Sequence, residues 1–94
     1  NVYNVSYDKA WEASKDAVVD AGGRLNEEDK AQGYIIGTFG MSAFSWGEKV
    51  SIFLTALDKN ATEVEVVSKR ALATNVTAKN WEPTIHKQIK NNLQ

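Results

Sequence analysis

Cysteine is absent from this 94-residue sequence. Disulfide bridges, zinc-thiolate sites and thiol catalysis are therefore excluded within these residues. An excess of charge of one sign is absent too, because 11 lysine and arginine residues nearly balance 12 acidic residues and the formal net charge is -1. Such a chain has no global field to attract phosphates, so we expect neither a nucleic-acid partner nor a polybasic membrane anchor.

Long apolar runs are also missing. No segment approaches the roughly 18 apolar residues that cross a bilayer, so the sequence predicts no transmembrane segment in this chain. The 43% hydrophobic and 24% charged residues are typical of a soluble globular domain. We expect a single domain over residues 1–94. The first residue is Asn1 rather than methionine, which favours a trimmed or processed chain.

The pattern of apolar residues predicts two helices and five strands in the order β-α-β-β-β-β-α. The expected strands are 2–5, 24–29, 34–39, 49–56 and 62–71, and the expected helices run over 7–21 and from about residue 80 to the end. Consecutive strands joined by short turns pair antiparallel. The sequence therefore predicts an α+β, two-layer, helix-grip-like domain, with an antiparallel sheet and both helices on one face.

Two neighbouring segments alternate clearly between apolar and polar residues, as strands with one buried face do. The residues expected to face the core are Val50, Ile52, Leu54, Ala56, Val64 and Val66. Phe53 and Val67 fall on the opposite face, where they raise the question of a binding role for the outer side of the sheet. Single exposed apolar residues need no functional explanation, however. Segment 24–29 is mostly polar and is expected to be a charged edge strand.

Residues suited to catalysis are scarce. Nucleophilic catalysis needs a base beside a nucleophile, and His86 is the single histidine. It lies one residue off the apolar stripe of the C-terminal helix, so we expect a solvated or boundary position. The acidic run 27–29 could ligate a hard cation, but consecutive strand residues point to opposite faces and no glycine-centred loop accompanies them. We expect no enzymatic activity, no cofactor and no metal site.

Tryptophan is well represented, with three residues in the chain. Trp11 and Trp81 lie on the two expected helices, where large rings commonly fill the space between helix and sheet. Met41, Phe44 and Trp46 share a loop with several turn-forming residues. They either fold back as a lid on the core or form a surface patch for a partner or an apolar ligand. Met41, Phe44, Trp46 and Trp81 are the candidate interaction or ligand-binding residues.

Four segments together carry a resemblance to a known group of domains. They are 5–11 (VSYDKAW), 33–37 (GYIIG), 44–50 (FSWGEKV) and 62–68 (TEVEVVS). They resemble small uncharacterised bacterial domains found in cell-envelope lipoproteins, with Ser-Trp-Gly-Glu at 45–48 as the most distinctive motif. The element order is similar to that of the helix-grip domains of the outer-membrane assembly lipoprotein BamC. The resemblance implies a fold and a cell-envelope location, and it implies no activity.

The leading hypothesis is a non-enzymatic binding or interaction module of the bacterial cell envelope or periplasm, with a cytoplasmic location as the alternative. It would act through the loop of Met41, Phe44 and Trp46, together with the stretch 72–79. The alternative function is a carrier or sensor of a small apolar ligand, held between the C-terminal helix and the sheet and lined by Trp81. The partner would be an unknown protein or an apolar ligand, and the chain a monomer or weak dimer.

Overall fold

The computed structural model describes residues 1–39, 48–70 and 82–93. In chain order the elements are β1 (Val2–Tyr3), α1 (Tyr7–Asp20), β2 (Arg24–Asp29), β3 (Tyr34–Phe39), β4 (Glu48–Asp58), β5 (Ala61–Arg70) and α2 (Glu82–Asn92). The strands form an antiparallel sheet with the order β1-β5-β4-β3-β2. The predicted α+β class and element order are confirmed.

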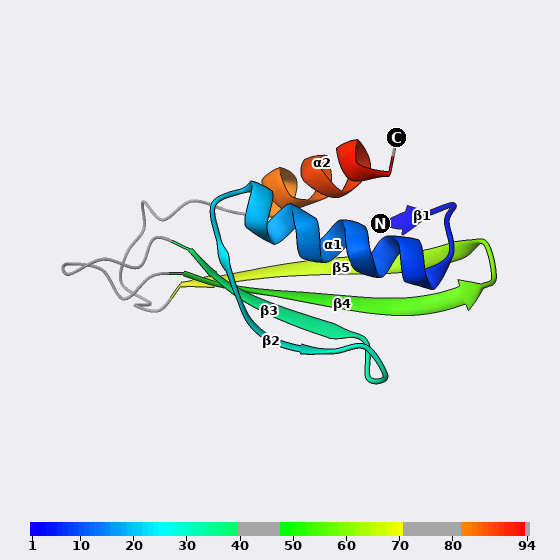
Figure 1. Cartoon of the computed structure of the whole chain (residues 1–94), viewed down its shortest axis with the longest axis horizontal. Coiled ribbons are helices and arrows are strands. Elements are labelled where there is room, and N and C mark those ends of the chain that lie inside the picture. The colour runs from blue at the N-terminus through cyan, green and yellow to red at the C-terminus, as the bar shows by residue number, and fades with distance from the viewer. Residues whose placement is uncertain (40–47, 71–81, 94) are drawn as a thin grey trace.

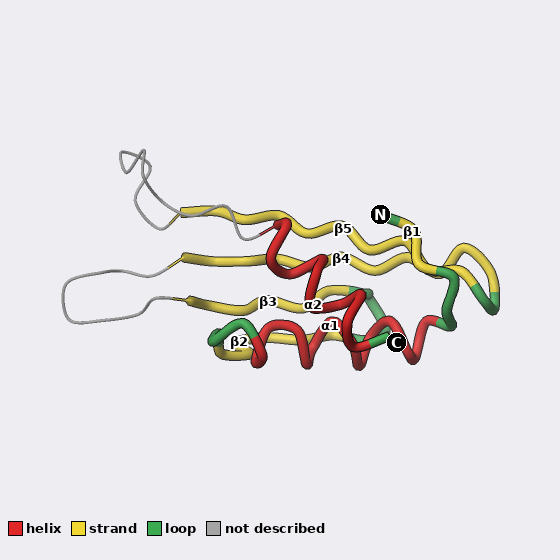
Figure 2. The backbone as a smooth tube through the Cα atoms, turned by 90° about the horizontal axis from the view of Figure 1, so that it is seen from above, coloured by secondary structure: helices red, strands yellow, loops and turns green. Residues whose placement is uncertain are grey.

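The helices form a layer over the sheet. Figure 1 shows α1 and α2 above the strands, and none of the described helices lies on the other side. Seen from above in Figure 2, α1 runs along the β2 side of the sheet, whereas α2 starts on the β5 side and crosses toward α1. The helices contact each other as well as the strands. None of the helices in the described part of the chain is long and apolar enough to span a membrane.

The ends of α1 follow from local sequence. Ser6 is the N-cap, with an extended backbone and an Oγ that accepts a hydrogen bond from the Lys9 N–H at 3.3 Å. After the helix, Gly22 takes a φ of 93°. The N–H of Gly23 then donates to the Val18 carbonyl at 2.9 Å, which is the Schellman arrangement that terminates helices at glycine.

The core lies between the sheet and both helices. Trp11 and Val18 of α1 and Ile85 and Ile89 of α2 are buried, which confirms the predicted burial of Trp11. The sheet contributes alternate residues from three strands: Ile35, Phe39, Val50, Ile52, Leu54, Val64 and Val66. The apolar alternation predicted for the two central strands is therefore confirmed up to Leu54.

Ala56 is the exception, because it is exposed although the alternation predicts a core position. It lies near the end of β4 and is paired with buried Thr62 of β5, so it keeps the core-facing register; the register shift comes after it, between Ala56 and Asp58. The alternation therefore continues through Ala56, but the helices leave this end of the sheet face uncovered. The strand bounds differ as well: β4 and β5 extend over 48–58 and 61–70, and β1 is shorter than the predicted 2–5.

Candidate interaction surface

All four candidate residues from the sequence lie outside the described residues. Met41, Phe44 and Trp46 fall within 40–47, and Trp81 falls within 71–81. The hypotheses that depend on them, including the role of stretch 72–79, stay predictions. A candidate surface must therefore come from the described helices and strands.

The alternative hypothesis places an apolar ligand between α2 and the sheet. Ile85 and Ile89 of α2 have no exposed surface, and they belong to the same core cluster as Val64 and Val66 of β5. A side chain that lines a cavity large enough for a water molecule would retain accessible surface. Over Ile85 and Ile89 the space between α2 and the sheet is therefore filled by the chain itself.

His86 is half-buried at the boundary of the core, as the sequence predicts, and it contacts β1 from α2. Its Nδ1 is 2.8 Å from the Tyr3 hydroxyl, and the two rings stack with their centroids 6.1 Å apart. Burial lowers the pKa of His86 below its ordinary value; the amino terminus adds to this effect and Glu82 opposes it. A neutral imidazole can accept a hydrogen bond from the Tyr3 hydroxyl at Nδ1. The lowered pKa and the hydrogen bond thus both favour neutral His86. In this state its hydrogen bond with Tyr3 links α2 to β1.

The carboxylates of β2 are directed to different partners. Glu28 is 3.3 Å from the Nζ of Lys15 on α1. Glu27 accepts a hydrogen bond from the Tyr34 hydroxyl at 2.6 Å, and this bond raises the pKa of Tyr34. Neighbouring residues of a strand point to opposite faces, as expected. Among the residues that the structure describes, no three His, Cys, Asp or Glu side chains gather closely enough to hold a metal ion.

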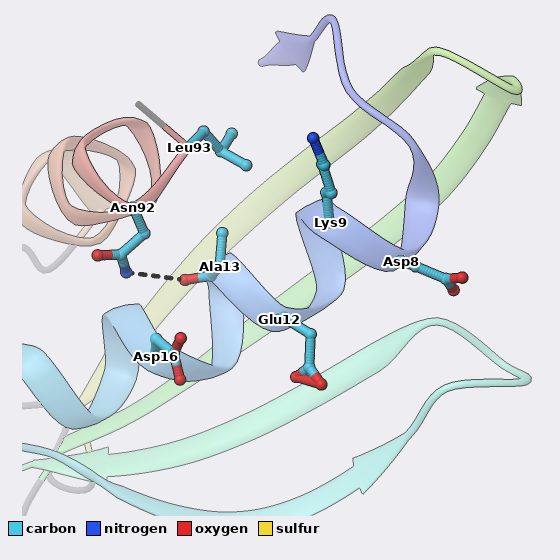
Figure 3. Close-up of a pocket in the computed structure, with 7 residues that line it drawn as sticks. All are labelled: Asp8, Lys9, Glu12, Ala13, Asp16, Asn92 and Leu93. Carbon is cyan, nitrogen blue, oxygen red and sulfur yellow. Dashed lines mark hydrogen bonds between the residues drawn. The ribbon is translucent and has the colours of Figure 1, made fainter.

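A groove of about 610 Å³ lies between α1 and the C-terminal end of α2. Figure 3 shows Asp8, Glu12 and Asp16 along α1, and the Asn92 amide that donates to the Ala13 carbonyl at 3.2 Å. This volume falls within the range of small-ligand pockets. However, every charged side chain that lines the groove is exposed. The groove is an open valley between two helix surfaces, and its acidic wall follows from carboxylates spaced four residues apart on α1.

The sheet face opposite the helices is here called the open face. Its residues alternate with core residues along each strand, and residues opposite one another on adjacent strands share a face. The strand register arranges them in four rows across the sheet. The first row is Arg24, Thr38 and Lys49; the second is Glu27, Ile36, Ser51 and Val67; the third is Asp29, Tyr34, Phe53 and Glu65; the fourth is Thr55, Glu63 and Val2.

Apolar side chains occupy the centre of the open face. Phe53 is 45% exposed, and Tyr34, Ile36 and Val67 around it are half-buried. Ser51 lies between Ile36 and Val67 in the second row, two residues from Phe53 on the same strand. A small side chain flanked by two larger ones therefore adjoins an exposed ring.

Charged residues surround the apolar centre of the open face. Arg24 and Lys49 lie in the first row, Glu27 in the second, Asp29 and Glu65 in the third and Glu63 in the fourth. Five of these six residues are exposed, and Asp29 is half-buried. The first row is therefore basic, whereas each of the other three rows carries acidic residues.

The sequence predicts part of this surface. It places Phe53 and Val67 opposite the core residues of their strands, and the structure confirms both positions. It does not single out Tyr34 or Ile36 as surface residues. The signal that could have found them is the alternation within 34–39, which becomes decisive once this segment is paired with β4.

Comparisons with protein-family models, with curated proteins and with solved structures found no match. The function of the open face must therefore be inferred from its own geometry and chemistry.

Proposed function

We propose that this chain is a non-enzymatic interaction module that binds a protein partner through the open face of its sheet. The observation that carries the proposal is the apolar centre around Phe53, which is exposed although a complete core lies on the other side of the same sheet. Tyr34, Ile36, Phe53 and Val67 are neighbours in two adjoining rows. Apolar side chains that gather on one face are typical of interaction surfaces, whereas scattered ones are not.

The shape and charge of the open face favour a protein over other partners. Small-ligand sites are concave and enclose most of the ligand, whereas a sheet face presents a broad surface. Charges of both signs around an apolar centre match the polar rim and apolar core of protein interfaces. The acidic residues in three rows of the open face and the net charge of -1 disfavour a nucleic acid.

We place this module in the bacterial cell envelope, as the resemblance of segment 44–50 and its neighbours implies. Cell fractionation, followed by immunoblotting of the product of the native gene, tests this location. We expect the protein in the periplasmic or membrane-associated fraction. Recovery in the cytoplasmic fraction would contradict the envelope location and leave the binding role of the open face standing.

Site-specific photo-crosslinking tests the binding role. A benzophenone amino acid is placed at Phe53 on the open face and, as a control, at Val19, an exposed apolar position on α1. In cells that produce the chain, we expect a product of discrete mass from position 53 and none from position 19. If position 53 gives no product, or both positions give the same one, the open face is not the binding surface. Far-UV circular dichroism of each purified variant establishes that it is folded.

A further inference from the structure

We infer that the partner segment bound at the open face is a cationic amphipathic helix, with an apolar stripe that lysine or arginine residues flank on both sides. This inference rests on the proposed function, because it names the partner segment of the same surface. The helix lies along the two central strands, β3 and β4, and its basic residues reach the carboxylates of β2 and β5. The complex has three layers, with the sheet between the helices of this chain and the helix of the partner.

The two central strands carry an uncharged strip over the second, third and fourth rows of the open face. β3 contributes Ile36 and Tyr34, and β4 contributes Ser51, Phe53 and Thr55. Neighbouring strands lie about 4.8 Å apart, so two strands make a strip roughly 10 Å wide. An α-helix with its side chains has a diameter of about 10–12 Å. The strip therefore has the width of one helix.

Carboxylates border this strip on both sides. Those on the β2 side belong to Glu27 and Asp29, and those on the β5 side belong to Glu63 and Glu65. None of these four carboxylates takes part in an ion pair among the described residues. An apolar strip between two acidic borders complements an apolar stripe between two basic ones. That second pattern is the one that a cationic amphipathic helix presents.

The strip also has a place for a large apolar side chain of the helix. Ser51 lies between Ile36 and Val67 in the second row. Phe53 follows two residues later on the same strand and the same face. Because serine has the smallest side chain of this group, a leucine or phenylalanine of the partner fits over it and contacts the larger side chains around it. Helices bound on such surfaces present their apolar anchors three or four residues apart.

The basic first row sets the direction of the helix. Arg24 and Lys49 lie in this row, whereas Glu63 lies at the other end of the face, in the fourth row. A helix carries a partial positive charge at its N-terminus and a partial negative charge at its C-terminus. The N-terminus of the bound helix therefore lies over the fourth row and its C-terminus over the first. The four rows span roughly 20 Å, which about 13 helical residues cover.

Fluorescence anisotropy of labelled peptides, titrated with the full chain, tests the inference. The probe is a designed helix of about 14 residues with a leucine stripe and lysine on both sides of it. A second peptide carries glutamate in place of lysine, and a third has the composition of the first in an order without a stripe. The lysine helix should bind with a dissociation constant of roughly 1–100 µM, and the other two at least about ten-fold more weakly. Equal binding of the three peptides, or no binding of the lysine helix, overturns the inference.

Charge-reversal variants locate the binding surface. Glu63→Lys with Glu65→Lys reverses the β5 border of the strip and should weaken binding of the lysine helix at least about ten-fold. Asp16→Lys with Asp20→Lys, on α1, makes the same change in net charge and is the matched control; all four side chains are exposed. The control should change the affinity by less than about three-fold. If both variants weaken binding equally, the peptide responds to the net charge of the chain, and the inference is overturned.

Ser51→Phe tests the packing of the helix on the strip. The added ring occupies the space over Ser51 that the central anchor of the helix needs, so binding of the lysine helix should weaken about ten-fold. Unchanged or tighter binding would overturn the placement of the helix over the second and third rows. Far-UV circular dichroism of each variant establishes that it is folded.

The crosslinking result separates this inference from the proposed function. Mass spectrometry identifies the partner segment that is joined to position 53, and this segment should hold an apolar stripe between basic residues. If position 53 joins a segment of another kind, or a second copy of this chain, the inference fails and the proposed function stands. If position 53 gives no product at all, both fail.

Discussion

Gly33, in the turn between β2 and β3, is a residue at which one added methyl group should strongly destabilise the fold. Its φ is 82°, in the left-handed region that favours glycine. Its N–H donates to the Asp29 carbonyl at 2.8 Å, and its carbonyl accepts from the Leu54 N–H at 2.7 Å. A Cβ at this position would collide with the Leu54 carbonyl oxygen and lie 3.1 Å from the Tyr7 hydroxyl. The colliding atom belongs to the backbone of β4, which cannot move aside as a side chain can.

Two terms set the expected loss for Gly33→Ala. Alanine in the left-handed region costs about 1–2 kcal/mol. Relief of the collision requires the turn to move away from β4, which breaks the hydrogen bond from Leu54 to Gly33 and costs about 1–2 kcal/mol more. The free energy of unfolding should therefore fall by about 2–4 kcal/mol, a large share of the roughly 5–14 kcal/mol expected for a domain of this size.

Urea unfolding followed by far-UV circular dichroism measures this loss. Gly22→Ala is the matched control, because Gly22 also has a positive φ, of 93°, but nothing lies within 4 Å of an added Cβ. It should show only the backbone term, about 1–2 kcal/mol. If the two variants agree within about 0.5 kcal/mol, the collision is absent. The close contact between Gly33 and the backbone of β4, which places Tyr34 beside Phe53 on the open face, would then be refuted.

Three further changes probe the core, the first helix and the histidine. Ile89→Ala should lower the free energy of unfolding by about 2–5 kcal/mol, because Ile89 is wholly buried. Val19→Ala, at an exposed site, should change it by less than about 0.5 kcal/mol. Equal effects of the two substitutions on urea unfolding would refute this packing of α2. Ser6→Ala removes the N-cap of α1 and should cost about 1 kcal/mol, whereas an unchanged urea midpoint would show that the hydroxyl does not cap the helix. Because the folded-state pKa of His86 is lowered from 6.5, the unfolded chain binds the proton first as the pH falls. The contribution of His86 to stability is therefore full above about pH 6.5 and declines as the pH falls through 6.5 toward the folded-state pKa. Urea midpoints at about pH 7.5 and about pH 5.5 should differ more in the original chain than in His86→Gln, and equal differences would contradict the shift.

The fold is predictable from the sequence wherever one face of an element is buried. The alternation of Val50, Ile52 and Leu54 leaves a single way to place that strand on the core, because a slip of one residue would expose all three. Segment 24–29 has little apolar content, yet its position between the glycines that end α1 and the turn at Gly33 indicates an edge strand. Periodicity does not predict the exposure of Ala56, because the pattern gives the face of the sheet on which a residue lies and not how far the helices cover that face.

The open face is less predictable, because its charges come from segments far apart in the chain. Arg24 and Lys49 share a row only through the pairing of both strands with β3. A register shift between Leu25 and Glu27 also decides which acidic residues of β2 lie on this face. Without that bulge the alternation after Arg24 would reverse, and Asp29 would point toward α1. No pattern in the six residues of the strand indicates where the extra residue lies.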